Sequence, residues 1–555
     1  ALAGWQIARR PMRGAGPVLL LVLAMALGML AIGQGASWDR SQSDQADFRA
    51  GAPVRVLASG DAGLGRTEEF AAVPGVRRTA PAARSELPLS GSRVATVLAL
   101  DTSRASMLIR PDLHSGPFLQ GLGPKGSVAG VKVPADTARL RLTAALRGPS
   151  PSTTVQATIT LEDRYGTPYR VPAGQLPADG RSHPLDVYVP GVPLTLTDLE
   201  LAVPVPSGDS EQHRFTVSEL TAKSTDGAVR RLPLPTSWKV TSRSEGVTST
   251  PDDTNKPAPP HLSSGSGRMS VDYGTGFIPL DDTWSVGVLT VRMKAPQPKA
   301  ADITAVATER FLTSAGASVG ENLDVPLGGE TVSVHIVRTV RELPTAAENG
   351  GALLVDLRTV NRVLQEQDGR SVEPTEWWLT TGRGATDRVT AALRARPDLD
   401  PAQIVVRDEV AGQLRDDPFG AGPEAAFTAA AGVAAALAAV GFAVSAAGSL
   451  RERGAEFAIL RALGAPRRRL ARAVALEQGV LVALALLVGS LLGTVLTRAV
   501  VPLIVLTDEA ARPVPTVLVQ LPLTRVAVLL GAVALAPLLV TAALALRRAD
   551  PARAL

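Results

Sequence analysis

Four long runs along the chain contain apolar residues and no charged side chain. They lie between Arg13 and Asp39, between Glu424 and Arg451, between Glu477 and Arg498, and between Arg525 and Arg547. A bilayer core of about 30 Å is crossed by about 20 residues of helix, and lipid offers no partner to backbone groups outside a helix or closed barrel. The pattern therefore predicts a transmembrane region of four helices.

The first run has an alternative interpretation as a secretory signal, because Arg9, Arg10 and Arg13 form a basic segment ahead of it. Its length favours an uncleaved span, so residues 1–36 are predicted to comprise a cytoplasmic basic segment and the first transmembrane helix. The chain as given has no initial Met. We therefore expect it to be processed or to be part of a longer polypeptide.

Between the first two runs, many segments alternate polar and apolar residues with the period of two that is typical of half-buried strands. The segments are 138–146, 153–171, 185–190, 194–205, 214–234 and 284–293. Asp163 to Gly166 and the Asp226–Gly227 pair are predicted hairpin turns. Strands at this spacing favour an antiparallel β-sandwich, which we place at residues 115–298.

The sandwich is expected to be inserted in an α+β domain whose two parts are residues 37–114 and 299–424. In the second part, 303–325 predicts a helix followed by a turn, and 330–340 predicts a strand. Helix and strand then recur at 351–367, 375–382, 385–397 and 402–414. Residues 241–267 are polar and Pro-rich, which predicts a mobile loop because little apolar surface is available to offset ordering.

The distribution of charge orients the predicted helices. Residues 451–477 carry seven Arg against three Glu, and Lys and Arg collect in short loops on the cytoplasmic side. Both termini and this segment are then cytoplasmic, and the large insertion is extracytoplasmic. The formal net charge of +5 is small and lies mainly at helix ends, which favours contact with anionic membrane lipids and excludes a nucleic-acid partner.

Candidate chemistry in the rest of the chain is weak, so we expect no enzyme. The chain has no Cys, and its five His are isolated, which leaves no thiol nucleophile and no metal-ligand spacing. The Gly-rich segment 60–69 lacks the Lys-Ser/Thr of a phosphate loop and has no clear strand before it. Asp356 is interpreted as a strand-end or capping residue. At Trp377 and Trp378 we favour one core and one rim side chain over an exposed aromatic edge.

Residues 451–477 form the most informative segment. Phe457, Leu460 and Leu463 recur at helical spacing among charged residues, which predicts an amphipathic helix. Gly464 suits the position after a helix, and Pro466 suits the first turn of the next one. An ordinary basic helix at the membrane surface is the alternative.

The string RERGAEFAILRALGAPRRRLARAVALE and the order of one span, a large domain and three further spans resemble FtsX-like (MacB-type) ABC transporter permeases. The resemblance implies that residues 425–555 form the family's transmembrane domain and that 451–477 contain its coupling helix. This helix would dock on a pair of ABC ATPase subunits. The ATP would be bound by those subunits, and this chain would hold no cofactor. The residues that match the motif, and to which ATPase coupling is assigned, are Arg451, Glu452, Glu456, Leu460, Arg461, Leu463, Gly464 and Ala465.

The family resemblance also implies a bacterial cell-membrane location and a role in moving a lipid, lipoprotein, peptide or antibiotic on the extracytoplasmic side. The opening WQIARRP resembles the start of the second repeat of long duplicated permeases, which implies a second permease half or a homodimer partner. Two alternatives stay open. The chain is a non-transporting transducer that regulates a cell-wall protein or senses an antibiotic, or the sandwich is a tethered carbohydrate-binding module.

Overall fold

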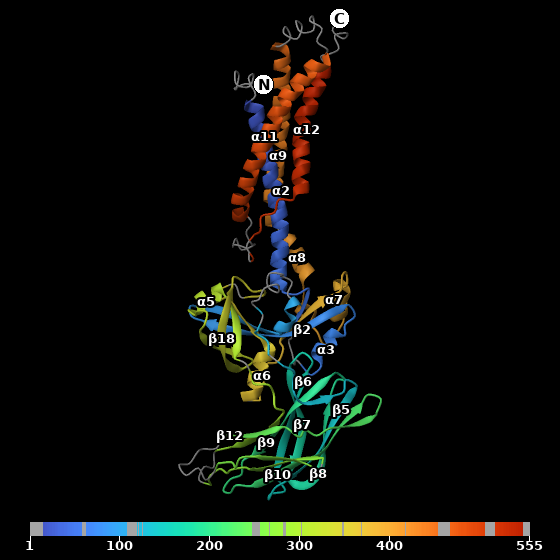
Figure 1. Ribbon diagram of the computed structural model, residues 1–555, viewed down its shortest axis with the longest axis vertical. Helices are drawn as coiled ribbons and strands as arrows, with labels where there is room; N and C mark the ends of the chain where they lie inside the picture. The colour runs from blue at the N-terminus through green and yellow to red at the C-terminus, as the bar shows by residue number, and fades with distance from the viewer. Residues whose placement is uncertain are drawn as a thin grey trace. The chain divides into compact units, whose positions relative to one another are not determined.

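The chain divides into two units, which we call the helical unit and the β-rich unit (Figure 1). The helical unit comprises Ala1–Arg49 and Asp408–Leu555, and the β-rich unit comprises Ala50–Arg407. The computed structural model describes all residues except 1–14, 58–62, 108–118, 120, 125, 247–255, 266, 281–284, 301, 347–348, 368, 417, 453–466, 505–514, 516 and 548–555.

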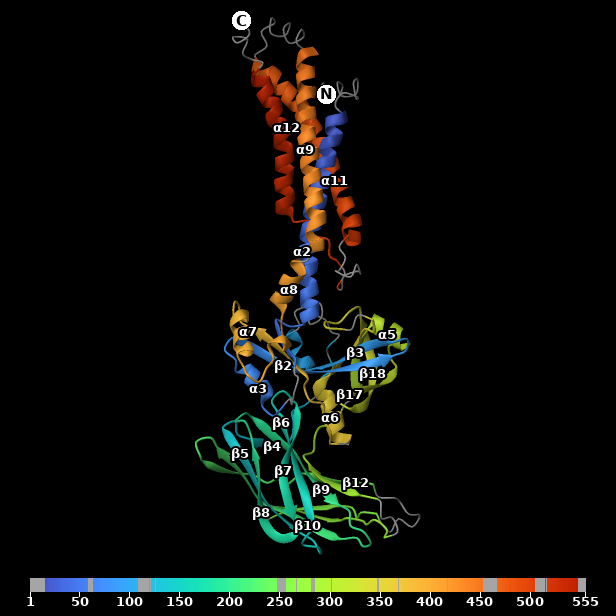
Figure 2. The same ribbon diagram turned by 180° about the vertical axis from the view of Figure 1, so that it is seen from behind.

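Four long helices form the helical unit and run alongside one another in both views (Figures 1 and 2). They are α2 (Ala15–Ala50), α9 (Pro418–Glu452), α11 (Arg467–Ile504) and α12 (Leu523–Arg547), with the short α8 (Arg407–Arg415) ahead of α9. All four contribute buried side chains to one apolar core, among them Leu21, Phe442, Val482 and Val533. This shared core shows that the N-terminal helix packs with the three C-terminal helices.

Three helices in the described part of the chain are long and apolar enough to cross a membrane. The stretches are Gly16–Ala50, Ala425–Val444 and Gly479–Ile504, and α12 adds a shorter apolar stretch at Leu523–Leu535. The finding supports a membrane protein with apolar helices at its N-terminus and in its C-terminal region. Whether α12 is a fourth span stays a prediction.

A nine-stranded mixed sheet forms the first part of the β-rich unit, in the order β17-β18-β16-β19-β3-β2-β20-β1-β21. Its strands are β1 (Val54–Leu57), β2 (Val76–Leu89), β3 (Arg93–Leu100), β16 (Ile303–Thr308), β17 (Asn322–Leu327), β18 (Glu330–Val340), β19 (Ala352–Asp356), β20 (Glu376–Thr381) and β21 (Ile404–Val406). The centre is the parallel pair β3–β19, whose register places Leu98 opposite Leu354. Segments more than 200 residues apart in the sequence thus form one sheet.

Short helices cover the nine-stranded sheet. They are α3 (Arg66–Ala71), α5 (Glu309–Ala315), α6 (Leu357–Gln367) and α7 (Thr386–Arg394), with the 3₁₀ turns η1 (Thr102–Met107) and η3 (Pro401–Gln403) in connections. In α6, Leu357, Val360 and Leu364 share one helical face and are buried against the sheet. The opposite face of α6 is therefore left for polar side chains.

The second part of the β-rich unit, which we call the two-sheet region, has two antiparallel sheets around one core (Figure 2). One sheet has the order β13-β14-β10-β5-β8 with β11 on β10, and the other has β12-β15-β9-β6-β7 with β4 on β9. The strands are β4 (Val131–Val133), β5 (Thr137–Arg147), β6 (Thr154–Asp163), β7 (Pro168–Pro177), β8 (Asp179–Tyr188), β9 (Leu194–Pro204), β10 (Gln212–Ser224), β11 (Val229–Leu232), β12 (Lys239–Glu245), β13 (His261–Gly265), β14 (Arg268–Gly274) and β15 (Val288–Lys294).

The alternation along these strands follows the predicted period of two. In β5, Leu140, Leu142, Ala144 and Leu146 are buried, and the residues between them are partly or fully exposed. The predicted hairpin turns are confirmed, because the amide of Gly166 donates to Asp163 O at 3.2 Å and the amide of Gly227 donates to Ser224 O at 3.1 Å.

The interpretation of 241–267 as a mobile loop is wrong at both ends of that segment. Strand β12 pairs with β15 along its whole length, and β13 pairs with β14. Both are outermost strands of their sheets, where the ladder needs few apolar side chains, and most residues of β12 and β13 are exposed. The central residues 247–255 lie outside the described residues.

Three further expectations are wrong. The start of 303–325 is the strand β16, because its side chains are buried in the sheet, and the helix begins only after Thr308, whose hydroxyl accepts from the Phe311 amide. A strand, β1, does precede the Gly-rich segment. Trp377 and Trp378 are both in the core, 1% and 0% exposed, because β20 is an inner strand covered on both faces.

Candidate functional sites in the helical and β-rich units

The segment to which ATPase coupling is assigned lies between two described helices. Helix α9 ends with Arg451 and Glu452, and α11 begins at Arg467. The other assigned residues lie outside the described residues, namely Glu456, Leu460, Arg461, Leu463, Gly464 and Ala465. Their role in coupling stays a prediction.

The helical unit contains an apolar cavity of about 340 Å³ between α2, α9 and α12. Small residues such as Ala24, Gly28 and Gly432 line most of it, and Arg525 on the first turn of α12 is the charged residue of the lining. Apolar pockets of this volume are large enough to hold part of a small ligand. The lining favours a group that is hydrocarbon over most of its length.

A second candidate site lies inside the β-rich unit, where β15 of the two-sheet region meets α6. Arg292 Nη1 donates to Gln365 O at 3.2 Å, and Lys294 Nζ donates to Glu366 O at 3.1 Å. These carbonyls are at the C-terminal end of α6, where helix carbonyls lack partners and where cations are favoured. The two cations therefore attach the two-sheet region to the helix.

Two glycines allow the close approach at this junction. A Cβ built on Gly369 would lie 2.4 Å from Arg292 Cζ, and a Cβ on Gly166 would lie 2.5 Å from Arg358 Nε. Both glycines have positive φ, of 70° and 80°, so a side chain at either position would also strain the backbone. Each part of the β-rich unit thus presents a glycine against an arginine of the other.

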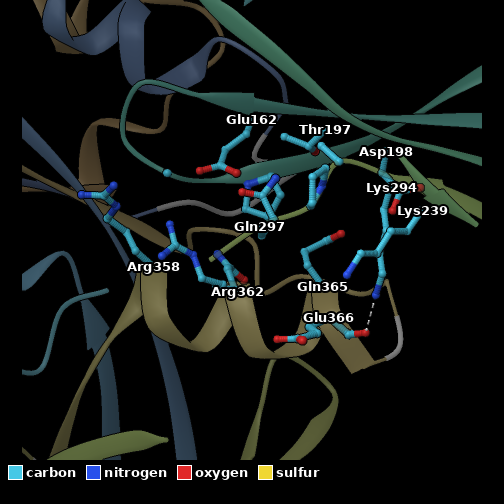
Figure 3. A pocket seen from close by; sticks show the side chains of 15 residues that line it. Glu162, Thr197, Asp198, Lys239, Lys294, Gln297, Arg358, Arg362, Gln365 and Glu366 are labelled. Carbon is cyan, nitrogen blue, oxygen red and sulfur yellow. Dashed lines mark hydrogen bonds between the residues drawn. The ribbon is translucent and has the colours of Figure 1, made fainter. Parts of the chain in front are cut away.

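The junction encloses a polar pocket of about 120 Å³, shown in Figure 3. We call it the junction pocket. Arg358 and Arg362 of α6 form one side, and Lys239 of β12 and Lys294 of β15 form the other. Glu162, at the end of β6, lies across from the two arginines. Four cationic side chains from two structural parts therefore surround one small cavity.

The carboxylates of the junction pocket have different environments. Asp198 Oδ2 accepts from Arg292 Nη2 at 2.5 Å, whereas its buried Oδ1 has no hydrogen-bond partner among the described residues. Burial raises the pKa of Asp198 to about 6, although Arg292 opposes the shift. Burial also raises the pKa of Glu162 to about 7, against the opposing charges of Arg358, Arg362 and Lys132. Glu162 is therefore only partly ionised near neutral pH.

The hairpin turn that follows Glu162 brings a second acidic residue, Asp163, near Glu68 of α3. Asp163 Oδ1 accepts from the amides of Tyr165 at 2.8 Å and Thr167 at 2.9 Å. Burial, and then the charge of Glu68 on α3, raise the pKa of Asp163 to about 8. Arg164 Nε lies 3.8 Å from Glu68 Oε1, beyond hydrogen-bonding distance. A proton on Asp163 thus relieves repulsion between two buried carboxyl groups.

Asp356 has the structural role expected of it. Its Oδ1 accepts from the Thr359 amide at 2.8 Å in the first turn of α6, and its Oδ2 accepts from the Thr102 amide at 3.0 Å. Both carboxylate oxygens are therefore used to start α6 and to fix the end of β3. Among the described residues, no group of three His, Cys, Asp or Glu side chains is placed to hold a metal ion.

Sequence reasoning missed the residues of the junction pocket. Arg358 and Arg362 stand four residues apart at the start of α6, whose first turn has no acidic residue. Helix starts favour acidic side chains, so this arrangement was a usable signal. The lysines opposite them carried no comparable signal.

Comparison with known proteins identifies the C-terminal part of the chain. Residues 428–550 match the family model described as FtsX-like permease C-terminal. This match covers the ends of α9 and α11 that flank 453–466, as well as α12. No curated protein matches the chain.

Proposed function

Because this chain carries the C-terminal domain of FtsX-like permeases at residues 428–550, we propose that it is the membrane subunit of an ABC transporter. That domain is the observation that carries the proposal. The long apolar helices of the helical unit support it, since a permease needs membrane spans. Both termini and residues 453–466 are then cytoplasmic, and the β-rich unit is extracytoplasmic.

In the proposed mechanism, ATP is bound and hydrolysed by a separate pair of ATPase subunits. Closure of that pair displaces the segment between α9 and α11, and the packed helices carry the displacement to the other side of the membrane. The core shared by Leu21, Phe442 and Val482 supports this transmission, because closely packed helices move as units rather than deform.

The cargo is proposed to be amphiphilic: a lipid, a lipoprotein, or a peptide or antibiotic with a hydrocarbon part. The apolar cavity beside α2 supports this class, because its lining offers hydrocarbon contact with a single cation, Arg525. Movement of the cargo takes place on the extracytoplasmic side.

The test is reconstitution of the chain with its ATPase in lipid nanodiscs. Replacement of Gly464 by Trp, or reversal of Glu452 and Glu456 to Lys, is expected to abolish binding and stimulation of the ATPase, because both changes fall in the assigned coupling segment. Glu409→Lys on α8 is the matched control and should leave both unchanged. Normal binding and stimulation by the Gly464 and Glu452/Glu456 variants would refute the coupling assignment.

A further inference from the structure

We propose that the junction pocket binds a tetrahedral oxyanion, the phosphate or sulfate group of a small solute. The proposal rests on the convergence of Arg358, Arg362, Lys239 and Lys294 around one cavity. It does not depend on the permease function, since every group involved lies within the β-rich unit.

The two arginines of α6 stand where a helix disfavours cations. Arg358 is the second residue of the helix, and Arg362 follows one turn later on the same face. Two like charges at this spacing repel each other, and the positive end of the helix dipole repels both. Neither arginine takes part in the cap, which Asp356 supplies, or in the apolar face of α6. An anion in the pocket would relieve both repulsions.

Four cationic side chains line the pocket against three carboxyl groups, those of Glu162, Asp198 and Glu366. Asp198 is paired with Arg292, whereas the Glu366 carboxylate accepts from the neutral Ala300 amide at 3.3 Å and keeps its charge. Within the described residues, no hydrogen bond or ion pair is formed by Arg358 or by Lys239. Glu162 is the remaining carboxyl group, and burial raises its pKa to about 7. The pocket is therefore electropositive at neutral pH.

The size and the charge of the pocket suit a tetrahedral oxyanion. A cavity of about 120 Å³ is several times the space of about 10 to 15 Å³ that a single water needs by the same measure. A phosphate or sulfate group brings up to two negative charges and at least three acceptor oxygens, which suits donors that approach from two sides. A carboxylate has one charge and two oxygens, so it offers less charge and fewer acceptors to the four cations.

Glu162 gives the site a pH dependence. The charged groups that face it are Arg358 and Arg362 from α6, Lys132 from β4, and the adjacent Asp163. A bound oxyanion favours the protonated form of Glu162, so binding takes up a proton. Affinity is then expected to fall as the pH rises through about 7.

The experiment is isothermal titration calorimetry on the full chain in detergent, with inorganic phosphate, sulfate, glycerol 3-phosphate and acetate as separate titrants at pH 6. Phosphate and sulfate are expected to bind at one site, and Arg358→Gln/Arg362→Gln should weaken that binding by about tenfold or more. Arg230→Gln, on an exposed arginine paired with Asp136, is the matched control and should bind as wild type does.

Further arms keep the test decisive if the double variant folds poorly. Lys239→Gln changes an exposed side chain and should also weaken binding, whereas Arg358→Lys/Arg362→Lys retains both charges and should bind more tightly than the glutamine pair. Binding of glycerol 3-phosphate more tightly than phosphate would identify an esterified phosphate as the ligand, and weaker or absent binding would assign the free anion. Sulfate, whose own charge is constant, should bind more weakly at pH 8 than at pH 6, and Glu162→Gln should reduce that difference, with Asp198 and Asp163 accounting for the remainder.

Three results would overturn the proposal. The first is absence of heat and of thermal stabilisation with both phosphate and sulfate. The second is binding that the arginine and Lys239 variants leave unaltered. The third is acetate binding as tight as that of phosphate.

Discussion

Arg292→Met tests how strongly the junction between β15 and α6 stabilises the β-rich unit. Arg292 is 7% exposed, and its guanidinium contacts both Asp198 Oδ2 at 2.5 Å and Gln365 O at 3.2 Å. Methionine has a stem of similar length, so the apolar packing of the side chain is largely kept. The change therefore removes the charge and two hydrogen bonds, and leaves Asp198 buried without its partner.

The expected loss in the free energy of unfolding is about 3 kcal/mol. Removal of one partner from a buried ion pair costs about 3 to 5 kcal/mol, because the remaining charge keeps its desolvation penalty. We choose the lower end since Lys294 stands directly opposite Asp198 in the β9–β15 register and can replace part of the lost attraction. Asp198→Asn removes the stranded charge. The loss in the free energy of unfolding for the double variant Arg292→Met/Asp198→Asn is thus expected to be about 2 kcal/mol smaller than the sum of the losses for the two single variants.

The assay is urea unfolding of the full chain in detergent, followed by tryptophan fluorescence, since Trp238 is buried in the core of the two-sheet region. Arg230→Met is the control, because the exposed pair that it breaks contributes about 1 kcal/mol or less. A loss below about 1 kcal/mol for Arg292→Met with an unchanged m-value, or simple additivity with Asp198→Asn, would refute the reasoning.

Two further predictions concern other parts of the chain. Asp163 has a folded pKa of about 8 against 3.8 for the free group, so the folded state binds more protons and stability falls as the pH rises between those values. Asp163→Asn keeps an acceptor for the turn amides and should raise the melting temperature at pH 9 but not at pH 4; an unchanged pH profile would contradict this. Gly493→Val should lower the melting temperature of the helical unit, because a Cβ at Gly493 would lie 2.9 Å from Met29 Cβ. Gly531→Val, with open space at that position, is the control, and an equal effect of both would contradict the close packing of α2 and α11.

The apolar helices were predictable because the absence of charge over a long run is a local property. Their ends were not. Helix α2 continues through Asp39 and Arg40 to Ala50, well past the predicted window. Ser37, Ser41 and Asp44 are buried in this extension, 0%, 2% and 3% exposed. A hydropathy window ends at the first charge, whereas the helix continues with partnered polar side chains: Ser37 Oγ accepts from the Gln520 amide at 2.9 Å, and Arg40 pairs with Asp44 within the helix.

The strands show the same limit. Alternation identified β5, which buries one face, but it failed for β12, where exposed Ser, Arg and Glu side chains carry no apolar pattern. The register of β12 with β15 is set by backbone hydrogen bonds along the whole strand. Backbone hydrogen-bonding groups are the same for nearly every residue type, so the pairing of β12 cannot be predicted from its side chains. An outermost strand of this composition is therefore predicted as a loop.

The junction pocket shows why a site can be missed even when each of its residues is visible. Arg358 and Lys239 are ordinary solvated charges when each is considered with its sequence neighbours. They face one cavity only because β15 attaches to the C-terminal end of α6 through Lys294, and because Gly166 and Gly369 let the two parts approach. Those contacts link segments about 70 to 190 residues apart. The one local clue was a helix that begins with arginines in place of acidic residues. In α6, the cap and the apolar face follow the usual pattern, but the first turn carries cations where a helix favours acidic residues. Such a local exception indicates that the cations have a partner outside the helix.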